Sequence, residues 1–134
     1  MSAYSFPFQD DAPVVTITLM PPDPTLVKLP TRRETFAVDT GFSDYLQVDW
    51  ETFYALGLHA YVSGTVPSEL ADGSLVIDLV ASVRLLIPEC GIDKIVRCIS
   101  NPTYGKDLLL VGNRLLKECN AVIDYRQEHT TLSD

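Results

Sequence analysis

The sequence predicts a mostly β fold with the geometry of a closed barrel or a sandwich. Short runs rich in β-branched and other apolar residues recur along the chain, separated by Pro, Gly, Asn and Asp. One of them, residues 75–87, alternates between an apolar set and a more mixed set, and a period of two over this length indicates a strand. Only short segments have helical character. Many short strands with few helices are typical of β-barrels and β-sandwiches.

A length of 134 residues is enough for one domain with a real core and too short for two ordinary ones. We expect this domain to span residues 13–129. Residues 1–12 mix polar and aromatic side chains and are expected to be a flexible arm that orders only on contact. Residues 130–134 are expected to be a C-terminal tail.

The first expected strands lie in the N-terminal third of the chain. Residues 14–19 are rich in β-branched side chains and stop before Pro21-Pro22, which cannot continue a strand. Residues 35–38 form a second, shorter strand that leads into the turn Asp39-Thr40-Gly41.

A short helix is expected next, after a brief extended stretch at residues 45–48. Asp49 can cap a helix over residues 50–56, and Gly57 can end it. The side chains expected to pack inward from this helix are Trp50, Phe53 and Leu56.

A β-hairpin is expected in the middle of the chain. Residues 65–70 and 75–87 flank Ala71-Asp72-Gly73, and Asp-Gly between two extended runs is a strong hairpin signal. The second arm is long, so we expect it to be bent.

The last third of the chain is expected to contain three strands and one short helix. Residues 94–99 precede Asn101-Pro102 and read as a strand. Residues 108–111 are uniformly apolar, so we expect a strand buried on both sides. A helical turn or two is expected over residues 115–118, followed by a final strand at residues 121–125.

Composition and charge exclude several classes of partner. The formal net charge of −8 repels phosphate backbones, so we do not expect nucleic acid as a partner. The longest apolar runs are far shorter than the ~20 residues that span a bilayer. The N-terminus lacks the basic start and long apolar stretch of a secretory signal, so we expect a cytoplasmic protein without a membrane partner.

Neither cysteine nor histidine indicates a metal site. Cys90, Cys98 and Cys119 are odd in number and show no C-x-x-C spacing, so we interpret them as small buried apolar residues. His59 and His129 are far apart in sequence, without Cys, Asp or Glu at ligand spacing. We therefore expect no metal site.

The tripeptide Asp39-Thr40-Gly41 is the main candidate for chemistry. Alone it is a weak signal, since a β-turn in which Asp accepts hydrogen bonds from local backbone N–H groups has the same residues. The strand before it, Ser43 just after it and a distant apolar run that ends at Gly112 before a probable helix make the combination specific.

With these motifs the sequence resembles the retropepsin-like aspartic proteases, the single-domain retroviral type and its relatives. Residues 36–41 match the family's apolar-apolar-Asp-Thr/Ser-Gly segment closely. Residues 110–116 match its second signature, two apolar residues and a Gly followed by a short helix with leucines. Residues 120–125 look like its usual closing strand. The resemblance covers roughly residues 30–126.

This resemblance implies a closed β-barrel of the single-domain aspartic protease type, with one or two short helices. It also implies a cofactor-free endopeptidase that cleaves peptide or protein substrates. The chain has a single Asp-Thr-Gly, so a two-fold homodimer would bring together the two Asp39 carboxyls, the catalytic groups. Two carboxyls at close range share one proton, and together they can activate water and protonate the carbonyl oxygen.

The same resemblance assigns supporting roles around Asp39. The Thr40 hydroxyl would bond across the dimer, and Gly41 would let backbone and substrate approach without a Cβ in the way. Ser43 follows in the same loop, and Gly112 would lie behind it. In retroviral members an acid four residues after the catalytic Asp pairs with an Arg just past the second-motif Gly. Here those positions hold Ser43 and Asn113, so the resemblance implies a pair shifted by one residue to Asp44 and Arg114.

Two features are interpreted as substrate contacts. Phe42 stands where the family has Ala or Ser, so it either narrows the cleft or points away from it. The Asp72-Gly73 hairpin resembles the flap that closes over bound peptide, with an ordinary surface hairpin as the alternative. Gly64 is a second candidate for a flexible flap base.

Two other readings of the whole chain remain open at this point. The fold could be kept as a non-catalytic module for dimerisation or peptide binding, with Phe42 filling the cleft. Alternatively, the chain could be an unrelated small β-barrel in which the two motifs coincide.

Overall fold

The computed structural model describes residues 2–23, 29–106 and 108–134. The strands are β1 (Ala3–Pro7), β2 (Val14–Met20), β3 (Arg32–Val38), β4 (Leu46–Gln47), β5 (Val62–Glu69), β6 (Leu75–Ile87), β7 (Ile92–Ser100), β8 (Leu110–Val111), β9 (Val122–Asp124) and β10 (His129–Ser133). The helices are α1 (Trp50–Ala55) and α2 (Asn113–Glu118), with 3₁₀ turns η1 (Leu58–Tyr61) and η2 (Pro88–Cys90).

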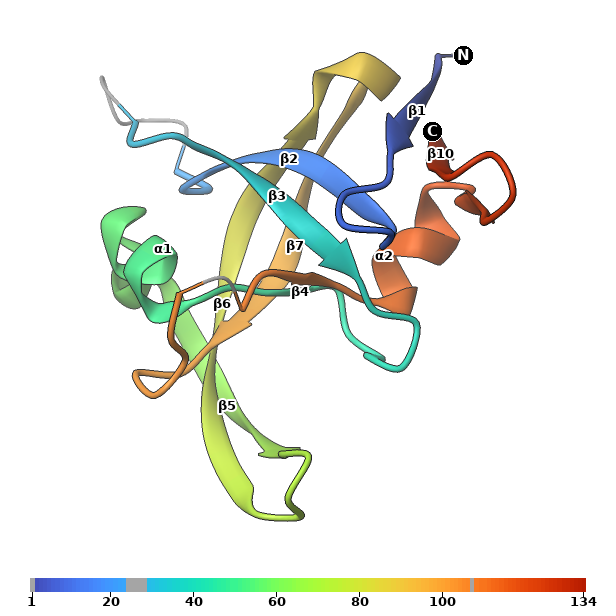
Figure 1. Cartoon of the computed structure of the whole chain (residues 1–134). Coiled ribbons are helices and arrows are strands. Elements are labelled where there is room, and N and C mark those ends of the chain that lie inside the picture. The colour runs from blue at the N-terminus through green and yellow to red at the C-terminus, as the bar shows by residue number, and fades with distance from the viewer. Residues whose placement is uncertain (1, 24–28, 107) are drawn as a thin grey trace.

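Six strands close into a barrel in the order β2, β3, β8, β4, β7, β6, and β6 pairs back with β2 (Figure 1). The closing pair joins Thr18–Met20 of β2 to Arg84–Leu86 of β6 in antiparallel register. The β3–β8 and β4–β7 pairs are parallel, and the remaining pairs are antiparallel. The predicted mostly β closed barrel with one or two short helices is therefore confirmed.

Alternating burial along the strands fills the barrel. In β2 the fully buried side chains are Val15, Ile17 and Leu19. In the second half of β6 they are Val83, Leu85 and Ile87. The strand at residues 75–87 is predicted from this alternation and the strand at residues 14–19 from its β-branched residues, and both strands are confirmed.

Helix α1 forms as its end signals predict. The Asp49 carboxylate accepts a hydrogen bond from the Thr52 backbone N–H (2.8 Å), which caps the helix. Gly57, at φ +70°, takes the left-handed conformation just past the last turn. Phe53 and Leu56 are fully buried, and Trp50 is half-buried with its ring stacked on Phe53.

The predicted hairpin is formed by β5 and β6. The Leu70 N–H donates to the Ser74 carbonyl (2.8 Å) and the Gly73 N–H donates to the Leu70 carbonyl (2.9 Å). Gly73, at φ +84°, supplies the left-handed residue that such a three-residue loop requires. The hairpin extends well beyond the barrel (Figure 1).

The face of β6 that points inward changes along the strand, which differs from the simple alternation that we expect. Leu75 and Ile77 are 71% and 58% exposed, whereas Asp78 is completely buried. The cause is the path of the strand: the first part of β6 pairs only with β5, and the barrel begins near Leu79.

The region after β7 agrees with the sequence except in one detail. Helix α2 and strand β9 confirm the helix and strand predicted there, although α2 begins before the predicted residue. Of residues 108–111, only Leu110 and Val111 form a strand, and Leu108 is 40% exposed. The prediction of a strand buried on both sides is wrong for Leu108, because it still belongs to the connection before β8.

The two ends of the chain correct the predicted flexible arm and tail. β1, within residues 1–12, and β10, which spans most of residues 130–134, pair antiparallel from Ala3↔Ser133 to Pro7↔His129. With β9 they form a separate three-stranded sheet (Figure 1). Phe6 and Leu132 are buried against the barrel core, and this burial holds both ends in place.

Across the residues that the structure describes, no helix combines the length and the apolar character needed to cross a membrane.

Candidate functional site

The Asp39 loop is fixed by the strands on either side of it. Parallel pairing of β3 with β8 places Val38 opposite Val111, and the Asp39 N–H donates to the Val111 carbonyl (2.9 Å). The loop then folds on itself, since the Gly41 N–H donates to Oδ1 of Asp39 (2.9 Å). The Phe42 N–H donates to the Asp39 carbonyl (3.1 Å). Asp39 is half-buried, and the hydrogen bond from Gly41 orients its carboxylate.

Gly112 lies directly behind this loop, as the sequence predicts. A Cβ on Gly112 would lie 2.1 Å from the Asp44 carbonyl oxygen and 2.7 Å from both Cδ2 and the carbonyl oxygen of Phe42. Such distances leave no room for any side chain. The Gly112 N–H donates to the Tyr45 carbonyl (3.0 Å), and the next N–H, of Asn113, donates to the Phe42 carbonyl (2.8 Å). The start of α2 is thus bonded to the Asp39 loop.

The other predicted loop residues lie around Asp39. There is little space for a side chain at Gly41, because a Cβ there would lie 3.3 Å from Oδ1 of Asp39. Thr40 and Ser43 are exposed. The Thr40 carbonyl accepts a hydrogen bond from the Asn113 side-chain amide (2.5 Å), a second link between the two motifs.

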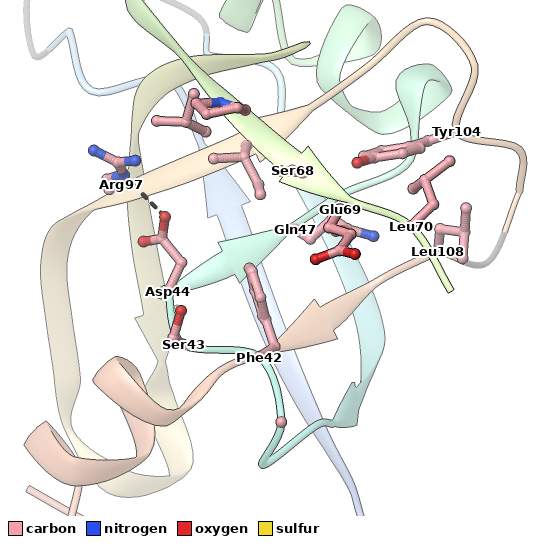
Figure 2. Close-up of a pocket in the computed structure, with 14 residues that line it drawn as sticks. Phe42, Ser43, Asp44, Gln47, Ser68, Glu69, Leu70, Arg97, Tyr104 and Leu108 are labelled. Atoms are coloured by element: carbon pink, nitrogen blue, oxygen red, sulfur yellow. Dashed lines mark hydrogen bonds and ion pairs between the residues drawn. The ribbon is translucent and has the colours of Figure 1, made fainter. Parts of the chain in front are cut away.

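A cavity of about 500 Å³ opens beside the loop, between residues 41–44 and strand β5. Its walls include Gln47, residues 66–69 of β5 together with Leu70, Tyr104 and Leu108. Phe42 points into this cavity (Figure 2). Of the two possibilities for Phe42, this position agrees with a side chain that narrows the cavity, and a role in the substrate cleft stays a prediction.

The predicted pair of Asp44 with Arg114 is wrong. Asp44 instead pairs with Arg97 of β7, with 3.0 Å between Nε of Arg97 and Oδ2 of Asp44 (Figure 2). The Arg114 guanidinium lies over the Tyr45 ring, 4.7 Å from its centre. The reason is topological, because parallel pairing of β4 with β7 brings Arg97 to the start of β4. No local sequence signal indicates this partner.

Asp72 and Gly73 lie at the tip of the hairpin and are not among the residues that line the cavity. Oδ1 of Asp72 accepts hydrogen bonds from the N–H (2.9 Å) and the hydroxyl (2.5 Å) of Ser74. These bonds to Ser74 hold the pKa of Asp72 below its usual value. The hairpin therefore meets the cavity with residues 66–70, while Asp72 and Gly73 shape its turn. Gly64 lies where the β5–β6 register shifts.

The cysteines and histidines take no part in this site. All three cysteines are buried, and burial is the main cause that raises the pKa of the thiols of Cys90, Cys98 and Cys119. A buried neutral thiol is a poor nucleophile. His59 stacks on the Tyr54 ring at 4.5 Å. Among the described residues, no three His, Cys, Asp or Glu side chains lie together as a metal site.

Comparison with known proteins gives a match at the level of structure. No protein-family model matches the sequence, and no curated protein matches it either. The fold is similar to the crystal structure of a retropepsin-like aspartic protease from Rickettsia conorii, with a TM-score of 0.69 and 17% identity over 97% of this chain and 89% of that chain.

A second solved structure is the retroviral protease-like domain of Ddi1 from Leishmania major. It matches with a TM-score of 0.54 and 13% identity over 90% of this chain and 89% of that chain. At these identities the likeness shows the fold. The chain therefore has a retropepsin-like fold, as its two motifs suggest.

Proposed function

We propose that this protein is an aspartic endopeptidase whose catalytic pair is formed by Asp39 from each of two identical subunits. One observation carries the proposal. In a retropepsin-like barrel, the Asp39-Thr40-Gly41 loop is bonded to Val111 and Asn113, the residues on either side of Gly112, and it lies beside a cavity that a hairpin borders. Neither a surface turn nor a purely structural Asp requires this combination.

The chemistry requires a second carboxyl group. Hydrolysis of a peptide bond by water needs one group to take a proton from the water and another to give one to the carbonyl oxygen. Two carboxyls at close range cannot both ionise and so hold one proton between them. A two-fold axis at the Asp39 loop supplies the second carboxyl, because the same residue then lies on both sides of the axis. We expect activity to be highest at acidic to near-neutral pH.

Strand β5 supplies an edge on which an extended peptide can lie. It is the last strand of its sheet, so one side of it has no strand neighbour among the described residues. The hydrogen bond from the Leu70 N–H to the Ser74 carbonyl fixes which groups face β6. By alternation, the N–H and carbonyl groups of Thr65 and Glu69 face outward, as does the carbonyl of Pro67, which has no N–H. A substrate backbone can pair with these outward groups.

The remaining roles are part of the same proposal. Thr40 would bond across the dimer, Gly41 would allow close approach of the substrate, and Ser43 and Gly112 would support the loop. Phe42 would limit the size of the substrate side chain beside it, and the Asp72-Gly73 tip would lie over the bound peptide. A cytoplasmic location stays a prediction.

Replacing Asp39 by Asn tests the proposal directly. The variant keeps the size of the side chain and loses the acid, so we expect cleavage of a peptide library to fall by at least about a thousandfold, since the water loses its base. Asp11→Asn, the same change at an exposed site, serves as the control. Sedimentation of the Asp39→Asn variant should still show a dimer.

Cleavage that persists in purified Asp39→Asn protein would refute the assignment. Absence of cleavage in the wild-type protein, together with peptide binding, would point to the non-catalytic module, which the similarity to a protease fold does not favour.

A further inference from the structure

The β5–β6 hairpin leaves the barrel at a defined point. The β6–β7 ladder begins at Leu79↔Ser100, whereas the β5–β6 ladder continues outward to Glu69↔Leu75. Beyond Leu79 the hairpin therefore consists of two strands only. A two-stranded hairpin is marginally stable in water, and its orientation must be fixed at its root.

A turn at residues 101–104, held by several hydrogen bonds, lies beside the root of the hairpin. The Asn101 side-chain carbonyl accepts bonds from the N–H (2.9 Å) and the hydroxyl (2.8 Å) of Thr103. The Tyr104 N–H donates to the Asn101 carbonyl (2.9 Å), and the Tyr104 carbonyl accepts from the N–H of Trp50 at the start of α1 (3.2 Å). The side-chain amide of Asn101 then reaches the hairpin and donates to the Ile77 carbonyl (2.9 Å).

The next residue of β6, Asp78, is completely buried. Its Oδ2 accepts a hydrogen bond from the Ser68 hydroxyl on the neighbouring strand. Its Oδ1 has no hydrogen-bond partner among the residues that the structure describes. Burying a carboxylate with an unsatisfied oxygen is unfavourable, so the presence of Asp at this position calls for a reason other than stability.

Tyr104 of this turn lies next to Asp78. Its side chain is almost fully buried. Burial is the main cause that raises the pKa of Tyr104 above its usual value, and the neighbouring Asp78 raises it further. Ser68 and Tyr104 both line the cavity beside Phe42 (Figure 2). The groups that meet at Asp78 thus also form the wall of the proposed peptide site.

We propose that Ser68, Asp78 and Tyr104 form a clamp that fixes the hairpin over the cavity, and that they are positioning residues for peptide binding. The clamp ties both strands of the hairpin to the 101–104 turn at the level where the barrel ends. This role in binding rests on the proposed function. With the clamp intact, the outward edge of β5 keeps a fixed distance from the Asp39 loop.

Two mild substitutions test the clamp, Ser68→Ala and Tyr104→Phe, separately and together. Each removes one hydroxyl and keeps the packing. Tyr54→Phe, on an exposed ring of α1, is the matched control. The measurement is native-state hydrogen exchange of backbone amides in residues 64–78, compared with amides of β2 in the barrel.

We expect hairpin amides to exchange about tenfold faster in each single variant, because each variant removes a hydroxyl beside the buried Asp78, while β2 amides keep their rate. The double variant should show less than the product of the two single effects, since both hydroxyls act through Asp78. In peptide cleavage, KM should rise about tenfold with a smaller change in kcat.

The proposed clamp would be refuted if the exchange rates of the hairpin amides were unchanged in both variants. It would also be refuted if hairpin and β2 amides were accelerated equally. The exchange measurement needs no substrate. If the wild-type protein shows no cleavage, the proposed function is refuted, but the exchange experiment still tests the clamp.

Discussion

Gly112 is the residue at which the structure leaves the least freedom. Its Cβ position is occupied by backbone of residues 42 and 44, which cannot rotate out of the way. We predict that Gly112→Ala lowers the free energy of unfolding by about 3 kcal/mol and displaces the Asp39 loop, since overpacking against backbone cannot relax cheaply. Urea denaturation measures the loss.

The control for this prediction is Gly105→Ala. A Cβ there meets nothing within 4 Å, so stability should change little. Equal stability of the Gly112→Ala and Gly105→Ala proteins would show that the loop is not packed as described.

The thiols of Cys90, Cys98 and Cys119 give a second prediction for single residues. Burial raises the pKa of each thiol, so the reactive thiolate is scarce at neutral pH and becomes populated only above the ordinary thiol range. We expect Ellman's reagent to label none of them within minutes at pH 8 in the folded protein and all of them in urea. Rapid labelling of any one thiol in the folded state would contradict its burial.

Among the elements, α1 depends on the capping residue just before it. The Asp49 carboxylate caps the helix through the Thr52 N–H, and α1 carries Phe53 into the core. We predict that Asp49→Ala lowers the free energy of unfolding by about 1 kcal/mol, the usual effect of losing such a cap. Thermal unfolding followed by circular dichroism measures the change. Glu51→Ala, in the exposed first turn, should have a smaller effect.

The elements with local signals are those that could be predicted from the sequence. Asp49 and Gly57 define α1, and Asp72-Gly73 defines the hairpin turn, because caps and turns depend on residues close in sequence. Strands β1 and β10 escape prediction, since Ala3 and Ser133 pair across almost the whole chain and neither strand has a clear period of two.

The same distinction applies within the candidate site. Asp39, Gly41 and Gly112 are found from their motifs. Arg97, the partner of Asp44, comes from a strand that is adjacent only in the folded barrel. The clamp residues are missed for a related reason: Asp78 lies in the mixed set of the β6 alternation, and it is buried where β6 pairs only with β5.

At the scale of the whole molecule, the proposed catalytic pair makes activity depend on assembly. We predict that the specific activity falls on dilution, because a separated subunit keeps only one Asp39. Each subunit has a net charge of −8, so two subunits repel each other and salt should screen this repulsion. Moderate salt should therefore shift the loss of activity to lower protein concentration.

Sedimentation over the same concentration range checks this prediction. Specific activity that stays constant while the protein is shown to be monomeric would rule out a pair of Asp39 residues as the catalyst.

The pairing of β1 with β10 also makes circular permutation of the chain possible. Because Ala3 lies opposite Ser133, a linker of a few residues can join the two ends. New ends can then be opened at the exposed Ala71-Asp72-Gly73 loop. Such a circular permutant would retain the barrel and both motifs, but β5 and β6 would no longer be connected. It would therefore separate the folding of the barrel from the closure of the β5–β6 hairpin over a peptide.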